Sequence, residues 1–148
     1  MALADFRYVM RFRVSFGDID MLQHVNHAAY IVWAETVRGA YLADVLGESV
    51  GGRNGVIMAR LEFHYERPLD YREDVVVGCR IARLGRKSFD FVHEIWSETH
   101  GNRAARGLCS LVAYDHETKA SKVVPERWRE IITAYEIVAP VLTTDVPS

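Results

Sequence analysis

Several features are scarce in this chain of 148 residues, and each shortage excludes a class of protein. No stretch reaches the roughly 18 uninterrupted apolar residues of a membrane span, and the N-terminal stretch MALADFRYVMRFRV carries charges where a signal peptide needs an apolar core. The net charge is only -2, so no nucleic acid partner is expected. Only two cysteines are present, Cys79 and Cys109, and they lie far apart in hydrophobic surroundings. We therefore expect two buried free thiols and a cytoplasmic location.

The composition fits one globular domain, because 49% of the residues are hydrophobic and 26% are charged. The chain has no repeats and no low-complexity tract. We expect a single domain over residues 1–138 and a C-terminal tail over residues 139–148.

Hydrophobic periodicity predicts a series of strands with one long helix after the first strand. Period-two alternation predicts strands over Tyr8–Phe16, Val56–Glu66, Glu73–Arg83, Lys87–Trp96 and Arg103–Asp115. Helical spacing runs from His27 to Leu46, and this helix is apolar on most of its circumference, so it must be wrapped by other elements. Pro125 begins a short helix. The order predicts an α+β fold: an antiparallel five-stranded sheet around one long central helix, with a short C-terminal helix.

Such a sheet leaves open edges and an uncovered outer face, so a homodimer is expected, and the dimer could pair further into a homotetramer. The strand over Val56–Glu66 is one source of apolar surface, because its alternation predicts a shared face for Ile57, Ala59, Leu61, Phe63 and Tyr65.

Ionisable side chains crowd where the first strand meets the helix, in the stretch FGDIDMLQHVNHAAYIVWAE over residues 16–35. Asn26 stands at the N-cap position, after which the first backbone N–H groups of the helix are unpaired and carry partial positive charge. A carbonyl docked there would be polarised, and a carboxylate a few residues earlier could attack it or activate water. We expect Asp20 to be that carboxylate, whereas Asp18 is expected to cap a turn or the helix start.

The two histidines of this cluster leave several possibilities open. His24 could shuttle protons, orient a neighbouring group, or donate a hydrogen bond within a structured loop. His24, His27 and the aspartates fit no standard zinc spacing, and no cysteine lies near them, so no metal is expected. The sequence also has no G-x-S-x-G motif and no P-loop.

The segment DIDMLQHVNHAAY closely resembles the D-x-D-x-x-x-H-V-N-N-x-x-Y signature of hotdog-fold acyl-CoA thioesterases of the 4-hydroxybenzoyl-CoA thioesterase group. The segments WAETVR, ARLEFHYERPL, GRKSF and ARGLCSLVAYD follow in the family's order, so the resemblance covers about residues 8–135. It implies a homodimeric enzyme, with its acyl groove between subunits, that hydrolyses an acyl-CoA to the free acid and coenzyme A. Coenzyme A is then part of the substrate, and no cofactor is expected.

Carried over by position, the resemblance makes Asp20 the catalytic nucleophile or general base. The backbone N–H around Asn26 and His27 would be the oxyanion donor, and His24 completes the expected catalytic group. His27 replaces the second asparagine of many relatives, which leaves the acyl preference open. The presence of His24 favours an aliphatic over a 4-hydroxybenzoyl group, and similar motifs in acyl-carrier-protein thioesterases leave the carrier open.

The resemblance also assigns substrate-binding residues. Tyr30 would line the acyl pocket. Arg86, Lys87 and Ser88 match a segment that meets the nucleotide end of coenzyme A in relatives, where adjacent cations suit phosphate. The same GRKS stretch could be only a polar hairpin turn, and the bound phosphates could contact a neighbouring subunit.

Three alternatives stay open at this point. Glu35 on the helix is a rival carboxylate, although a surface pair with Arg38 three residues later would explain it without chemistry. A hotdog hydratase or dehydratase would use a similar acid–base pair on an acyl thioester. A non-catalytic module would bind acyl-CoA without releasing a thiol.

Overall fold

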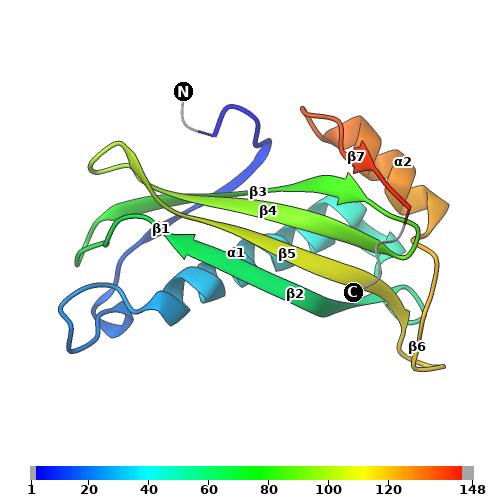
Figure 1. The fold of residues 1–148 in the computed structure, drawn as a ribbon, viewed down its shortest axis with the longest axis horizontal. Helices are drawn as coiled ribbons and strands as arrows, with labels where there is room; N and C mark the ends of the chain where they lie inside the picture. Colours follow the sequence, from blue (N-terminus) through cyan, green and yellow to red (C-terminus); the bar gives the residue numbers. More distant parts are fainter. Residues whose placement is uncertain (1–2, 145–148) are drawn as a thin grey trace.

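The computed structural model describes residues 3–144, apart from the side chain of Glu48, and shows a curled sheet packed around one long helix (Figure 1). Five long strands pair antiparallel in the order β1-β3-β4-β5-β2. They are β1 (Tyr8–Arg13), β2 (Gly55–Tyr65), β3 (Asp74–Leu84), β4 (Ser88–Ser97) and β5 (Asn102–Asp115). The predicted α+β architecture is confirmed.

The central helix α1 (His27–Tyr41) lies against the inner face of the sheet and continues into a π-helical turn, η2 (Leu42–Leu46), and a 3-10 turn, η3 (Gly47–Ser49). Its buried positions follow the helical spacing of the sequence, as in Tyr30, Trp33, Val37 and Tyr41. These side chains and the inward residues of β3, β4 and β5 form one continuous core. The core therefore fixes α1 against the sheet, and with it the start of the helix where the polar cluster lies.

Shorter elements complete the fold. A 3-10 turn, η1 (Phe16–Asp18), follows β1, and the strand β6 (Ala120–Ser121) pairs with β5. The helix α2 (Glu126–Tyr135) begins after Pro125, as predicted. Within the expected tail, β7 (Val141–Leu142) pairs parallel with β3, so this part of residues 139–148 is tied to the sheet. Residues 145–148 of the expected tail lie outside the described residues.

Strand β2 contains a β-bulge at Ala59, where its pairing with β5 shifts by one residue. A bulge adds one residue to a strand and so reverses the alternation of the side chains beyond it. Leu61 therefore faces the helix side together with Met58, whereas Ile57 faces the opposite side. The predicted common face of β2 is wrong for Ile57 for this reason, and right for Leu61, Phe63 and Tyr65, while Ala59 is the unpaired residue of the bulge.

The two cysteines are free and buried, as predicted. Cys79 lies on β3 and Cys109 on β5, with β4 between them. Neighbouring strands lie about 4.8 Å apart, so the two residues are roughly 10 Å apart, too far for a disulfide. Within residues 3–144, no helix is both long enough and apolar enough to cross a membrane.

Candidate active site

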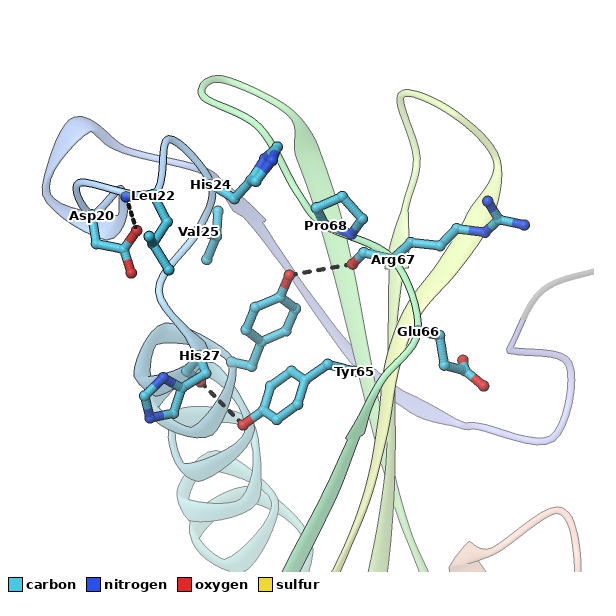
Figure 2. A pocket seen from close by; sticks show the side chains of 10 residues that line it. Asp20, Leu22, His24, Val25, His27, Tyr65, Glu66, Arg67 and Pro68 are labelled. Carbon is cyan, nitrogen blue, oxygen red and sulfur yellow. Dashed lines mark hydrogen bonds between the residues drawn. The ribbon is translucent and has the colours of Figure 1, made fainter.

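A pocket of about 350 Å³ opens where the loop between β1 and α1, the first turn of α1 and the end of β2 meet (Figure 2). Four of the predicted site residues line it: Asp20, His24, His27 and Tyr30. The other lining residues are Leu22, Val25, Tyr65, Glu66, Arg67 and Pro68. The strand–helix junction singled out in the sequence is therefore one wall of a real cavity.

Asp20 begins a tight turn that reverses the chain just before the helix. The Asp20 amide donates to the carbonyl oxygen of His24 (3.2 Å), and the Gln23 amide donates to the carbonyl oxygen of Asp20 (3.0 Å). Asp20 Oδ1 accepts a hydrogen bond from the Leu22 amide (2.9 Å), and within residues 3–144 this is the one hydrogen bond of the carboxylate. Figure 2 shows the carboxylate on the side of the pocket that also carries His27. Most of its acceptor capacity is therefore open to a ligand.

Asp18, by contrast, is used by the backbone around it. Its Oδ2 accepts hydrogen bonds from the amide (2.8 Å) and the hydroxyl (3.0 Å) of Ser15. Its carbonyl oxygen accepts from the amide of Asn26 (2.7 Å). Asp18 thus closes η1 and fixes the residue that caps the helix, which agrees with the structural role expected for it.

Asn26 caps α1, and its contacts determine which helix-start amide is left over. Its side-chain oxygen accepts from the Ala28 amide (2.8 Å), and its carbonyl oxygen accepts from the Ala29 amide (2.9 Å). The described residues offer no acceptor to the amide of His27. Because an unpaired N–H at a helix start attracts an oxygen that carries negative charge, the His27 amide is the available donor.

His24 lies across the turn from Asp20, but its imidazole points away from the Asp20 carboxylate and toward the loop between β2 and β3 (Figure 2). Its Nδ1 lies 3.0 Å from Oδ1 of Asp70 in that loop. A carboxylate can only accept, so Nδ1 carries the hydrogen. Of the three possibilities for His24, the geometry favours a hydrogen bond within a structured loop.

Two tyrosines form the wall between α1 and β2. The Tyr30 hydroxyl donates to the carbonyl oxygen of Arg67 (3.5 Å), and the Tyr65 hydroxyl donates to the carbonyl oxygen of His27 (3.4 Å). Their rings meet edge to face with centroids 5.1 Å apart, and the His27 ring also meets Tyr65 edge-on. Burial raises the pKa of Tyr30 to about 12, so its hydroxyl stays neutral. This aromatic wall beside the helix start suits an acyl group.

The segment Arg86, Lys87 and Ser88 does not reach this pocket. Arg86 and Lys87 lie in the turn between β3 and β4, and Ser88 begins β4, at the far end of the sheet from the start of α1 (Figure 1). β3 has 11 residues and begins beside the pocket, so the turn lies about 35 Å away along the strand. One chain alone therefore does not bring these residues and Asp20 to the same small ligand.

The second wall of the pocket was not predicted from the sequence, and it consists of Tyr65, Glu66, Arg67 and Pro68. These residues end a strand and begin a loop, which is a common location for functional groups, and the motif YERP could have drawn attention to them. The Glu66 side chain is engaged elsewhere, because Arg103 donates to it (2.7 Å) and thereby lowers the pKa of its carboxyl group.

The rival carboxylate Glu35 is exposed on α1 and does not line the pocket of the single chain. Its expected partner Arg38 is buried instead, with Nη1 3.4 Å from Nε2 of His93 on β4. The expected surface pair is therefore replaced by a contact between α1 and the sheet. Among residues 3–144, no group of three or more histidine, cysteine, aspartate or glutamate side chains could hold a metal ion.

Comparisons with known proteins agree with this fold. The family model of the thioesterase-like superfamily matches residues 14–132. No curated protein sequence matches the chain. A thioesterase from Thermus thermophilus, solved with coenzyme A and zinc, is 32% identical, with a TM-score of 0.77 over 88% of this chain and 95% of that one.

Two further structures show the same fold at lower identity. The PA2801 protein of Pseudomonas aeruginosa is 26% identical, with a TM-score of 0.76 over 86% of this chain and 98% of its own. A thioesterase superfamily protein from Jannaschia sp. CCS1 is 22% identical, with a TM-score of 0.80 over 88% and 83%. The protein is thus a hotdog-fold enzyme of the thioester hydrolase class. It belongs to the thioesterase-like superfamily, which confirms the resemblance seen in its motif.

Proposed function

We propose that this protein is an acyl-CoA thioesterase that hydrolyses its substrate to a free carboxylic acid and coenzyme A. The observation that carries the proposal is that Asp20, whose carboxylate accepts one hydrogen bond, and His27, whose amide has no acceptor among the described residues, line the same pocket. A thioester carbonyl between them would accept a hydrogen bond from the amide while Asp20 acts on its carbon. Coenzyme A in the Thermus thermophilus relative supports coenzyme A as the carrier.

Asp20 can act in either of two ways, and both release the same products. As a nucleophile, its carboxylate adds to the thioester carbon and expels the thiolate, which leaves an acyl anhydride that water then cleaves. As a general base, it takes a proton from water, and the resulting hydroxide adds to the carbon before the thiolate leaves. In both routes the carbonyl oxygen becomes negatively charged, and the His27 amide stabilises that charge.

The remaining residues bind and arrange the substrate. Tyr30 and Tyr65 would form the acyl wall, and the cap at Asn26 would hold the first turn of α1 so that the His27 amide is available to the substrate oxygen. Water is the second substrate, so we expect neither a cofactor nor a metal. The free thiols Cys79 and Cys109 agree with action in the cytoplasm, where cysteines stay reduced.

We also propose that the protein acts as a homodimer, which could pair further into a homotetramer. The outermost strand β2 presents partly exposed apolar side chains on its helix side, with Met58 43% and Leu61 37% exposed. A long edge strand with apolar side chains favours pairing with a second chain. A partner chain would also offer its own Arg86, Lys87 and Ser88 to the phosphates of a coenzyme A bound at this pocket.

The proposal is tested with purified Asp20→Ala and a panel of acyl-CoA substrates, with free thiol measured by a thiol-reactive dye. We expect kcat on the best substrate to fall by about 10³-fold, while the circular dichroism spectrum and Tm stay as in the unchanged protein. Full turnover by Asp20→Ala would contradict the assignment. The dye also distinguishes the thioesterase from the alternatives. A hydratase would convert acyl-CoA without releasing thiol, and a binding module would only bind it.

A further inference from the structure

The position of Asp20 depends on the residue across its turn. The amide of Asp20 donates to the carbonyl oxygen of His24, and the isolated bridge between Ile19 and Val25 brackets the same turn. Gln23 adopts φ +69°, a left-handed conformation that closes the turn. Any displacement of His24 would therefore be transmitted to Asp20 through one short hydrogen-bonded loop.

His24 is in turn fixed to the loop between β2 and β3. Its Nδ1 is 3.0 Å from Asp70 Oδ1, and the amide of the next residue, Val25, donates to the carbonyl oxygen of Leu69 (3.0 Å). Leu69 is buried, which anchors this loop in the core. The wall that carries Asp20 is thus fastened to the opposite loop by one backbone and one side-chain hydrogen bond.

The loop around Asp70 is itself held by a buried carboxylate. Glu73 is 5% exposed, and its Oε2 accepts from the Asp70 amide (2.6 Å) while its Oε1 accepts from the Ser97 hydroxyl (2.6 Å). The Val14 amide donates to the carbonyl oxygen of Glu73 (2.9 Å). A continuous series of contacts therefore leads from the end of β4 through Glu73 and Asp70 to His24.

We propose that Asp70, acting through His24, is a positioning residue that holds the Asp20 turn in its reactive geometry, and that Glu73 supports Asp70 from the core. The inference deepens the proposed thioesterase function and rests on it. His24 then contributes through its position rather than by exchanging protons with the substrate. The direction of its imidazole, toward Asp70 and away from the Asp20 carboxylate, supports this role.

The exposure of the pair explains why its effect should be on rate rather than on stability. The side chains of His24 and Asp70 are 52% and 62% exposed, and exposed ion pairs contribute little to folding. A displacement of about 1 Å in a reacting group can nevertheless cost roughly 100-fold in rate. The pair can therefore matter to catalysis while leaving Tm nearly unchanged.

The test compares two kinds of substitution at Asp70 and His24: alanine, which removes the hydrogen bond, and asparagine, which can keep it. The assay is acyl-CoA hydrolysis. We expect Asp70→Ala and His24→Ala each to lower kcat about tenfold, with KM changed less than about twofold. Asp70→Asn and His24→Asn, which keep an acceptor and a donor near the original atoms, should stay within about twofold of the unchanged enzyme. The pH–rate profile of His24→Asn should keep its shape.

A matched control variant and a second measurement, hydrogen exchange, which does not depend on activity, complete the test. The Arg13–Asp74 pair has a similar length (2.9 Å) and exposure (60% and 50%) but lies outside the Asp20 turn. Asp74→Ala should leave kcat unchanged, whereas Asp70→Ala should speed hydrogen exchange at the Asp20 and Gln23 amides.

Two results would overturn the inference. If His24→Asn is as inactive as His24→Ala, then His24 has a chemical role in the reaction. If Asp70→Ala leaves both kcat and the hydrogen exchange rates unchanged, then Asp70 does not position Asp20. Neither result touches the thioesterase assignment, which depends on Asp20→Ala. Conversely, full turnover by Asp20→Ala would refute the function whatever the Asp70 variants do.

Discussion

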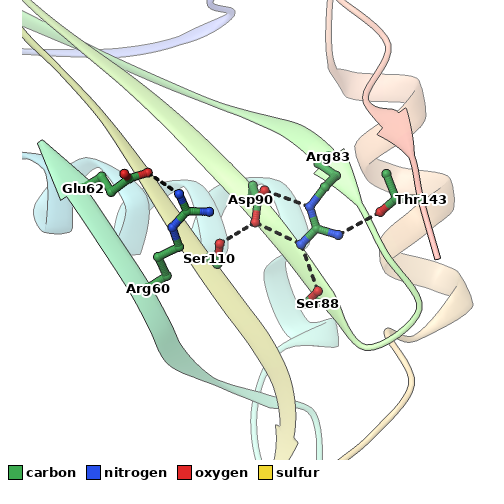
Figure 3. A network of polar contacts seen from close by, with 7 residues as sticks. All are labelled: Arg60, Glu62, Arg83, Ser88, Asp90, Ser110 and Thr143. Carbon is green, nitrogen blue, oxygen red and sulfur yellow. Dashed lines mark hydrogen bonds and ion pairs between the residues drawn. The ribbon is translucent and has the colours of Figure 1, made fainter. Parts of the chain in front are cut away.

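Asp20 and Asp90 are two carboxylates of one chain with opposite surroundings. Asp90 on β4 accepts from Arg83 Nε (2.8 Å), Arg83 Nη2 (3.0 Å) and the Ser110 hydroxyl (2.7 Å), as Figure 3 shows. Arg83 also donates to the hydroxyls of Ser88 and Thr143, so this network joins three strands and the segment after β7. Within residues 3–144 the carboxylate of Asp20 accepts a single hydrogen bond, from the backbone amide of Leu22.

The difference shows how partners decide what a carboxylate does. Burial alone would raise the pKa of Asp90, but the hydrogen bonds from Arg83 and Ser110 outweigh it and lower the pKa. Both of its oxygens accept hydrogen bonds from Arg83 or Ser110, so this carboxylate joins neighbouring strands of the sheet. The oxygens of Asp20 are open on the pocket side, which makes the same functional group available for chemistry.

The largest change in stability should come from the network of Asp90. Asp90→Ala leaves the guanidinium of Arg83, whose side chain is 18% exposed, without its carboxylate. We expect the free energy of unfolding to fall by about 3 kcal/mol, measured by urea denaturation at fixed protein concentration, with kcat unchanged for the folded fraction. Glu98→Ala, which breaks the exposed pair with Arg11, should cost less than about 1 kcal/mol. Equal losses in both variants would contradict this distinction.

Histidines extend the comparison, because His93 is buried where His24 is exposed. Burial, together with the nearby charge of Arg38, lowers the pKa of His93 to about 3 from its ordinary value of 6.5. Between about pH 6.5 and pH 3, His93 is protonated in the unfolded chain but stays neutral in the folded chain. The free energy of unfolding therefore decreases as the pH falls from 6.5 toward 3.

The expected slope is at most about 1.4 kcal/mol per pH unit, measured as the free energy of unfolding from about pH 7 to about pH 5. His93→Gln should flatten this part of the curve. The same acid sensitivity in His93→Gln as in the unchanged protein would show that another group is responsible.

The long elements could be predicted from the sequence because each buries one face and therefore repeats with a regular period. Strands β2, β3, β4 and β5 match their predicted ranges within one residue. The first strand ends at Arg13 and not at the predicted Phe16, which begins the turn η1, and α1 ends at Tyr41, with a π-helical turn in place of the predicted helix up to Leu46. The bulge at Ala59 was not predicted, because the residues before it are apolar on both faces of the strand and the pattern gives no sign of the shift. The pairing of β7 with β3 was not predicted for a different reason, because two residues are too few to show the alternation of a strand.

The candidate site was predictable only where it is local in sequence. Asp20, Asn26 and His27 lie within eight consecutive positions, so a helix start and a nearby carboxylate could be inferred from spacing. Asp70 is 46 positions from His24, and their contact exists only because the fold brings two loops together. Long-range contacts of this kind carry no periodic signal, so the motif YERP could mark the residues of the second wall, but only the folded chain shows that they lie opposite Asp20.

The smallest changes in stability and in kcat should come from the helix cap at Asn26, which affects both the fold and the site. Asn26→Ala removes the acceptor of the Ala28 amide, and we expect the free energy of unfolding to fall by about 1 kcal/mol. The freed Ala28 amide would then compete with the His27 amide for the substrate oxygen, so kcat should fall about twofold to fivefold. Asn26→Ser, which restores a capping oxygen, should recover both quantities in denaturation and turnover assays. Recovery of stability without recovery of kcat would show that the Asn26 side chain meets the substrate directly and does more than shape the start of α1.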